Sequence, residues 1–331
     1  MDRIFSGIQP TGNLHLGNYL GAVQNWVKLQ SSYECIYCIV DMHAITTFQK
    51  PETLIGNILE VASILIASGI DINNSILFNQ SRVAMHAELA WIFNCTAKIG
   101  WLNRMTQFKD KAGKNREKAS AGLYVYPNLM AADILAYKAT HVPVGDDQKQ
   151  HLELTRDIAT SFNDNYKTDF FPLVEPLILG EATRVMNLRD GSKKMSKSDE
   201  SDFSRINITD SAEKISAKIK KAKTDSLPVP DSSSELSNRL EAKNLIGIFA
   251  ALRGISLQDI IKDYGGGSFS VLKDDLTECI IEELQPVGKE IKELLNNKDE
   301  LDKILKDGAE RAKEISRPVV NEVKNIVGFL T

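Results

Sequence analysis

The segment 191–199, GSKKMSKSD, holds three lysines and three serines around one apolar residue, Met195. It is too polar for a core strand and too rich in serine for a strong helix, so we expect a surface loop. Lys194 and Lys197 are charges on flexible stems, and the hydroxyl and backbone N–H groups beside them can donate to phosphate oxygens. The segment therefore offers a way to bind a polyphosphate, and a solvated turn is the alternative.

A second segment suited to phosphate is 7–18, GIQPTGNLHLGN, which contains three glycines between a predicted strand and a predicted helix. Glycines allow tight turns and close backbone approach, and a helix N-terminus presents free N–H groups to an anion. The spacing fits neither a dinucleotide-binding fingerprint nor a Walker loop. Taken alone, the segment could equally be a structural turn.

A third segment, 122–135, places an acidic residue among apolar ones. We expect a helix with Pro127 in its first turn. Tyr126, Met130 and Asp133 then share one face, and a buried carboxylate there needs a partner. A planar apolar ligand with one N–H group would suit this face.

Two further polar segments could contribute to a ligand site. Residues 104–118 carry six basic and two acidic side chains, so Lys109 and Lys111 could reach a polyphosphate from a flexible loop, or could simply face solvent. The predicted strand 142–144 leads into Gly145, Asp146 and Asp147. Acidic residues at a helix start are common dipole partners, so their place after a strand is the stronger argument.

The elements that must position these residues alternate between strand and helix. Strands are expected at 3–8, 35–40, 76–78 and 142–144, and helices at about 15–30, 51–67, 84–100 and from 149. This alternation predicts a Rossmann-like, doubly wound α/β domain with a parallel sheet. Ligands of such sheets bind outside the carboxyl ends of the strands, where 7–18 and 41–46 would lie.

Beyond residue 199 the strand pattern stops. Helices are expected at about 211–223, 236–253, 256–263, 269–296 and 299–316, with Pro318 ending or kinking the last one before 319–329. We therefore divide the chain into an α/β domain, 1–198, and an all-helical domain, 199–331. Lys218, Lys220, Lys221 and Lys223 form a basic face that could meet an anion or water.

Composition narrows the class of protein. The 331 residues are 43% hydrophobic and 25% charged, and their net charge of −4 argues against simple adhesion to nucleic acid. Cys35 and Cys38 lie three apart in a predicted strand, so they point to opposite faces and are expected to be structural. We find no apolar run long enough to span a bilayer and expect a cytoplasmic protein.

Six motifs together resemble a known family. His15-Leu16-Gly17-Asn18 is similar to the first signature of class I aminoacyl-tRNA synthetases, with Asn18 in place of its final histidine, and residues 194–198, KMSKS, match the second at every position. Segments 7–10, 41–46, 131–135 and 145–151 resemble bacterial tryptophanyl-tRNA synthetases. The likeness is dense over 3–199 and weaker beyond.

The resemblance implies an activity. Enzymes of this family use ATP with Mg²⁺ to turn L-tryptophan into tryptophanyl-adenylate and pyrophosphate, then transfer tryptophan to the 3′ end of tRNA(Trp). No protein nucleophile and no protein-ligated metal is expected; catalysis depends on positioning and on stabilising phosphate charge.

The resemblance also implies roles for individual residues. Catalytic residues would be His15, Asn18, Lys194, Lys197 and Lys111, with Lys109 as an alternative to Lys111. ATP would contact Gln9, Pro10, Thr11, Gly17, Asn18, Gly145, Asp146, Asp147, Val185, Lys194, Met195, Ser196, Lys197 and Ser198. Tryptophan would contact Phe5, His43, Tyr126, Met130, Asp133, Val142, Val144 and Gln148, with Asp133 accepting the indole N–H.

The family's helical domain binds the tRNA anticodon, and its members are homodimers, so both properties are expected by resemblance alone. Three other functions remain open from the sequence: a tyrosyl-tRNA synthetase, another nucleotidyl transferase, and a non-catalytic paralogue. The tryptophan motifs argue against the first, the intact second signature against the second, and the retained phosphate-binding residues against the third.

Overall fold

A five-stranded parallel sheet forms the centre of the protein in this computed structural model. The structure describes residues 2–106, 108, 117, 119–144, 149–177, 184–197 and 199–330. The strands run in the order β3-β2-β1-β4-β5, so the direction of winding reverses between β1 and β4. The strands are β1 (Arg3–Ile8), β2 (Glu34–Ile39), β3 (Ile76–Asn79), β4 (His141–Pro143) and β5 (Glu175–Leu177). The predicted Rossmann-like α/β fold is confirmed.

Apolar side chains of the central strands β1 and β2 are buried in two clusters, one on each face of the sheet. In β2, Cys35 packs in one buried cluster with Tyr37, whereas Cys38 packs in the opposite cluster with Ile36. The prediction that the two thiols point to opposite faces is thus confirmed. The short strand β5 escaped the sequence analysis; it contains Pro176 and lies at the edge, where a missing N–H is tolerated.

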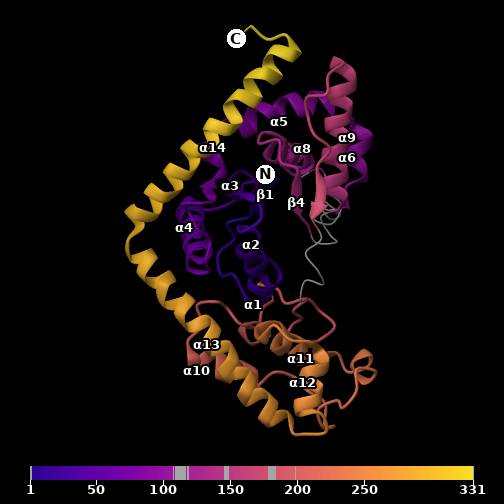
Figure 1. The fold of residues 1–331 in the computed structure, drawn as a ribbon, viewed down its shortest axis with the longest axis vertical. Coiled ribbons are helices and arrows are strands. Elements are labelled where there is room, and N and C mark those ends of the chain that lie inside the picture. The colour runs from indigo at the N-terminus through magenta and orange to yellow at the C-terminus, as the bar shows by residue number, and fades with distance from the viewer. Residues whose placement is uncertain are drawn as a thin grey trace.

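Helices flank this sheet as expected for a doubly wound domain (Figure 1). The predicted helix 15–30 is divided into three parts, with a wider π turn in the middle. The helical elements of this part are α1 (Leu16–Asn18), η1 (Tyr19–Val23), α2 (Gln24–Leu29), α3 (Asp41–Ala44), α4 (Pro51–Ala67), η2 (Gln80–Arg82), α5 (Met85–Thr96), α6 (Ile99–Arg104), α8 (Ala121–Leu135) and α9 (Lys149–Tyr166).

The second part is helical, and the described residues from 199 onward contain no strand. Its elements are η5 (Asp202–Ser204), α10 (Ala212–Lys220), η6 (Glu235–Ser237), α11 (Leu240–Arg253), α12 (Leu257–Tyr264), α13 (Phe269–Asn296) and α14 (Lys298–Val327). Among the described helices none alone is long and apolar enough to cross a membrane; α11 and α12 reach that composition only as a pair bent by 111°.

The expectation that Pro127 lies in the first turn of its helix was wrong. α8 begins at Ala121, where the Ser120 side chain accepts a hydrogen bond from the Leu123 N–H. Of the two outcomes expected at Pro318, an end or a kink, the end is excluded, since α14 continues to Val327. Pro318 is exposed while Ser316 and Val320 on either side are buried, so its ring points to solvent and core packing holds the helix together.

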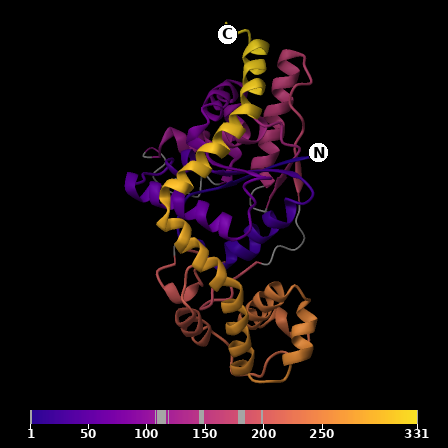
Figure 2. The ribbon, with the colours of Figure 1, turned by 60° about the vertical axis from the view of Figure 1, so that its left-hand side comes forward.

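The last helix leaves the helical part and returns to the sheet. Figures 1 and 2 show α13 and α14 as one long arm that runs from α10–α12 back along the α/β part. The approach is close: a Cβ at Gly308 would lie 1.9 Å from the Leu77 carbonyl oxygen of β3. The division of the chain at residue 198 stays a prediction. By sequence α14 belongs to the helical part, where it contacts α13, but it also packs on β3, α4 and α5 of the α/β part.

Candidate active site

A cavity of about 1250 Å³ lies at the carboxyl ends of β1 and β4, where the winding reverses. Parallel α/β sheets bind ligands at this position. Residues of the sheet part form one side, and α11 with the start of α12 forms the other. Eleven predicted site residues line it: Phe5, Gln9, Thr11, Asn18, His43, Tyr126, Met130, Asp133, Val142, Val144 and Lys197.

The turn after β1 is shaped by its backbone and by α4. Gly12 has φ +63° and Asn13 φ +41°, both in the left-handed region. The Asn13 N–H donates to Glu60 Oε1 at 3.0 Å, and a Cβ at Gly12 would lie 2.6 Å from Asn57 Oδ1. The turn therefore has no room for a side chain at Gly12, and Gln9 and Thr11 of the turn line the cavity. Pro10 is buried beneath it.

The predicted first signature starts α1 in a buried setting. The His15 N–H donates to Asn18 Oδ1 at 3.2 Å, and a Cβ at Gly17 would lie 3.0 Å from His15 Nδ1. Burial first, and then the charges of Lys197 and nearby Arg205, lower the pKa of His15 to about 4. His15 is therefore neutral at pH 7, and its Nδ1 has no hydrogen-bond partner among the described residues. Such a ring can exchange hydrogen bonds with phosphate without adding charge.

The second signature lies against the first. Lys197 Nζ donates to the Gly12 carbonyl oxygen at 3.0 Å and to the Thr11 hydroxyl. Burial lowers the pKa of Lys197 to about 8, although the charge of Glu60 opposes this. Lys197 therefore carries a positive charge at pH 7 and reaches the predicted phosphate-binding turn.

The residues around Lys197 serve this loop in other ways. Met195 is 2% exposed, and its N–H donates to the Val185 carbonyl oxygen at 3.1 Å. Both side chains belong to the core, so they anchor the loop and do not line the cavity. Lys194 is exposed and Ser196 half-buried, and neither lines the cavity. At the head of the loop, a Cβ on Gly191 would lie 2.8 Å from the backbone of α11.

The α8 face of the cavity combines apolar walls with one carboxylate. Asp133 is 1% exposed, and its Oδ2 lies 2.7 Å from His43 Nε2. Its Oδ1 lies 2.6 Å from both His86 Nδ1 and Gln80 Nε2. Burial acts to raise the pKa of Asp133, but the charge and hydrogen bond of His43, and then His86, bring it below its usual value. The cavity thus contains an ionised acceptor in an apolar pocket.

The structure adds residues that sequence reasoning missed. Gln80 and His86 form hydrogen bonds with the Asp133 carboxylate. Glu60 accepts the Asn13 N–H in the turn after β1, and His151 Nε2 lies 2.7 Å from the Tyr126 hydroxyl. Gln80 directly follows β3, so the rule that polar residues after buried strands belong to the site could have found it. The others are on helices, and no local pattern marks them.

Seven predicted site residues lie outside the described residues. They are Lys109, Lys111, Gly145, Asp146, Asp147, Gln148 and Ser198.

Known proteins resemble both the sequence and the geometry. The family described as tRNA synthetases class I (W and Y) matches residues 2–285, and the chain belongs to this family. Within it, the chain is 55% identical to the tryptophan–tRNA ligase of Rhizobium meliloti (strain 1021), over 99% of this chain and 98% of that one. The resemblance to the bacterial tryptophan enzymes is therefore confirmed.

Solved structures give the same picture. Tryptophanyl-tRNA synthetase from Mycoplasma pneumoniae superposes with a TM-score of 0.89 at 31% identity, covering 100% of this chain and 98% of that one. The Campylobacter jejuni tryptophanyl-tRNA synthetase complexed with ADP and tryptophan gives a TM-score of 0.84 at 32% identity, covering 99% and 100%.

Proposed function

We propose that this chain is a tryptophan–tRNA ligase whose active site is the cavity between β1, β4, α8 and α11. The enzyme activates L-tryptophan with ATP to tryptophanyl-adenylate and pyrophosphate, and then transfers tryptophan to the 3′ end of tRNA(Trp). One observation carries the proposal: a single cavity joins a buried carboxylate among apolar side chains to a cationic, glycine-containing turn. The first suits an indole ring, and the second suits a triphosphate.

In this proposal Asp133 accepts the indole N–H, while Phe5, Tyr126, Met130, Val142 and Val144 surround the ring. A buried carboxylate strongly disfavours a ring without a donor, because the charge would then lack a partner. His43 donates to Asp133 and so helps to hold it ionised. Gln148 remains an expectation at the amino group.

At the other end, Gln9, Thr11 and Asn18 face ATP directly. Lys197 neutralises charge that develops on the pyrophosphate, with exposed Lys194 able to join it, and neutral His15 donates a hydrogen bond. Pro10, Gly17, Val185, Met195 and Ser196 shape the backbone around these groups. Lys111, Ser198 and residues 145–147 remain expected contacts of the phosphates, ribose and adenine.

We propose that Mg²⁺ enters with ATP. Among the described side chains at the predicted phosphate site, His15, Thr11 and Lys197 are neutral or cationic. The one described carboxylate beside them, Glu60, already accepts the Asn13 N–H, so these residues do not form a carboxylate cage. A Mg²⁺ ion commonly keeps waters and binds through substrate phosphates, which fits such a site. When bound, the ion would share the neutralisation of the phosphates.

The proposal assigns the helical part, 199–331, to the tRNA anticodon. The support is the family likeness. Of the four lysines of the predicted basic face, Lys218 can be excluded as a contact of tRNA. Lys218 is 3% exposed and pairs with Asp210 at 2.6 Å and Asp202 at 2.8 Å, so it stabilises η5 and α10 and does not reach RNA. A ligase that supplies aminoacyl-tRNA works where ribosomes are, so we place it in the cytoplasm.

We also propose a homodimer, supported by apolar side chains exposed around the N-terminus of α8. Ile45, Phe48, Trp91 and Ile99 are 60%, 88%, 66% and 71% exposed. α8 connects the segments of Ile45, Phe48 and Ile99, because Ser120 Oγ donates to the Thr46 carbonyl and the Tyr124 hydroxyl donates to the Ile99 carbonyl. Exposed patches of this kind often mark protein interfaces.

Substitution of Asp133 tests the proposed function. Asp133→Asn removes the charge and keeps the volume, so we expect the KM for tryptophan in ATP–pyrophosphate exchange to rise about 10- to 100-fold, the range for a hydrogen bond to a charged group. The KM for ATP should change less than threefold. An unchanged KM for tryptophan would show that Asp133 does not bind the amino acid.

A further inference from the structure

The buried carboxylate of Asp133 accepts a defined set of hydrogen bonds. An ionised carboxylate has about four acceptor positions, two on each oxygen. Oδ1 accepts from Gln80 Nε2 and from His86 Nδ1, each at 2.6 Å, and both of its positions are therefore used. Among the residues that the structure describes, Oδ2 accepts only from His43 Nε2, at 2.7 Å. These residues therefore leave one acceptor position on Oδ2 for a ligand in the cavity.

The orientation of Gln80 is fixed by its second partner. Its Oε1 accepts the backbone N–H of Met42 at 3.1 Å, so its NH₂ group must be the end that faces Asp133. Gln80 is 0% exposed, and it lies in η2 immediately after β3. The amide can therefore act only as a donor to Oδ1.

The tautomer of His86 is fixed by its two partners. Its Nδ1 lies 2.6 Å from Oδ1 of the ionised Asp133, which can only accept, so the proton of a neutral His86 ring sits on Nδ1. Nε2 then accepts from the Tyr137 hydroxyl at 2.7 Å, which has a proton to donate because burial raises the pKa of Tyr137 well above its usual value. His86 is 0% exposed and comes from α5.

Other titratable groups near Asp133 do not compete for it. Cys38 of β2 faces it from the sheet, and burial, followed by the charges of Asp133 and Asp41, raises the pKa of this thiol well above its usual value. Tyr137 also remains protonated, as above. His43 touches Tyr126 edge-on, with ring centroids 6.0 Å apart. Within the described part of the chain, the groups around the carboxylate are thus His43, His86, Cys38 and Tyr137, with Gln80 as the neutral donor.

We propose that Gln80 and His86 are positioning residues for amino-acid specificity: they saturate Oδ1 of Asp133, so that Oδ2 alone is presented to the N–H group of the bound amino acid. This inference rests on the proposed role of Asp133. Without either donor, the carboxylate could rotate or take up a proton, and its preference for a ring with an N–H group would fall. Neither residue touches the substrate.

The test compares tryptophan with its benzothiophene analogue, in which sulfur replaces the indole N–H. The measured quantity is the ratio of kcat/KM for the two amino acids in ATP–pyrophosphate exchange. In Gln80→Leu and His86→Leu we expect this ratio to fall at least tenfold, through a higher KM for tryptophan and with little change for the analogue. His86→Asn, which can offer its amide N–H in place of Nδ1–H, should recover most of the ratio.

A matched control variant separates the loss of Asp133 positioning from a general loss of protein stability. Asn128 is 1% exposed on α8, and its amide donates to Asn94 Oδ1 of α5 at 2.7 Å, away from the cavity. Asn128→Leu therefore removes a buried hydrogen bond between the same two helices as His86→Leu. It should lower thermal stability and leave the ratio unchanged. An equal fall of the ratio in Asn128→Leu would overturn the proposal.

The pH profile gives a second readout. Loss of a donor disfavours the charged form of Asp133 and raises its pKa. In Gln80→Leu the KM for tryptophan should therefore rise as the pH falls from 7 to 5.5, while the wild-type KM stays flat. A flat profile together with a wild-type ratio in Gln80→Leu would overturn the inference; if His86→Leu does not fold, Gln80→Leu decides alone.

Asp133→Asn distinguishes this failure from that of the proposed function. If the ratio collapses in Asp133→Asn but not in the Gln80 and His86 variants, only the positioning role is wrong. If the ratio stays at the wild-type value in Asp133→Asn itself, the assignment of Asp133 to the N–H group is wrong, and the positioning role is lost with it.

Discussion

At the scale of single residues, one cavity holds two opposite electrostatic settings. Near the turn after β1, burial lowers the pKa of Lys197 to about 8 and of His15 to about 4, so a cation and a neutral ring meet there at pH 7. On the α8 side, donated hydrogen bonds and positive charge keep the buried Asp133 ionised. A substrate with a polyanionic end and a single N–H group at an apolar end would satisfy both settings.

The Lys197 environment predicts a dependence on pH. Lys197 loses its proton as the pH rises through about 8, and its positive charge is then no longer available to neutralise the phosphates. We expect kcat/KM for ATP in pyrophosphate exchange to decline above pH 8, because this parameter reports the free enzyme. In Lys197→Arg the guanidinium stays charged, so any remaining activity should show no such decline up to pH 9.5. The same alkaline decline in Lys197→Arg would assign it to another group.

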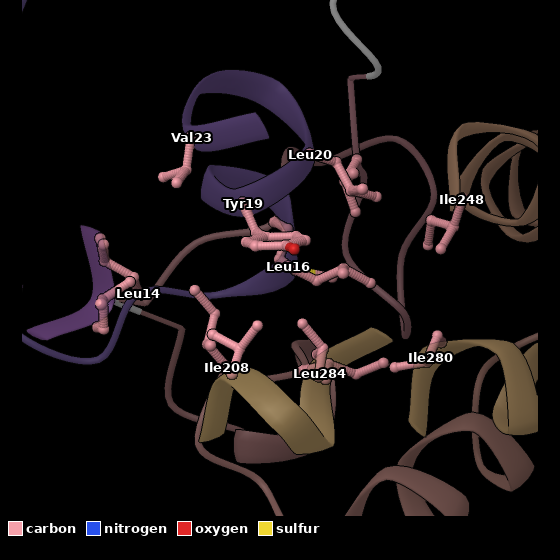
Figure 3. Packing of buried hydrophobic residues seen from close by; sticks show 14 of the residues in the cluster. Leu14, Leu16, Tyr19, Leu20, Val23, Ile208, Ile248, Ile280 and Leu284 are labelled. Carbon is pink, nitrogen blue, oxygen red and sulfur yellow. The ribbon is translucent and has the colours of Figure 1, made fainter. Parts of the chain in front are cut away.

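At the scale of elements, two contacts join the α/β part to the helical part. One is made by α1 and η1, which follow His15, and the other by α14. Leu16 and Leu20 pack against Ile248 of α11 and Ile280 of α13 in one buried cluster (Figure 3). The Tyr19 hydroxyl also donates to Glu283 Oε1 at 2.6 Å. The helix that carries His15 therefore rests on the helical part.

The contact of α14 with β3 gives a stability prediction. A Cβ at Gly308 would lie 1.9 Å from the Leu77 carbonyl oxygen, so Gly308→Ala must push the helix away from the strand. We expect a loss of about 1–3 kcal/mol in the free energy of unfolding, as for overpacked cores, measured by urea denaturation. As a control, Gly56→Ala in the exposed part of α4 has open space around it and should gain about 0.5–1 kcal/mol. Equal effects at the two sites would contradict this packing.

Elements with a strong local signal were predictable. The periodic segment 51–67, opened by Pro51, and the apolar run of β2 were placed within a residue of their ends. Pro127 was expected to open a helix, but Ser120 caps the start of α8 instead. Pro318 was expected to end or kink a helix, and core packing carries α14 past it, so the helix does not end there. Asp133 could be singled out as a buried carboxylate. Its partners Gln80 and His86 could not, because they lie 53 and 47 residues away and only the tertiary fold brings them together.

At the scale of the whole molecule, the cavity is complete only when both parts are in place. Its walls include Lys197 and Asp133 from the α/β part and Lys243 and Asn244 from α11. Asn244 Nδ2 also donates to the Met186 carbonyl at 2.9 Å, beside the loop that carries Lys197. The helical part therefore supports the loop that carries Lys197 directly, which links the proposed tRNA-binding part to the proposed active site.

The central claim is that this cavity activates tryptophan, and amino-acid-dependent ATP–pyrophosphate exchange tests it most directly. The purified chain should exchange pyrophosphate with tryptophan and not with tyrosine at equal concentration, because the chain is 55% identical to a tryptophan–tRNA ligase. In this proposal the Asp133 carboxylate accepts the indole N–H. Exchange supported by tyrosine alone, or by neither amino acid, would contradict the account.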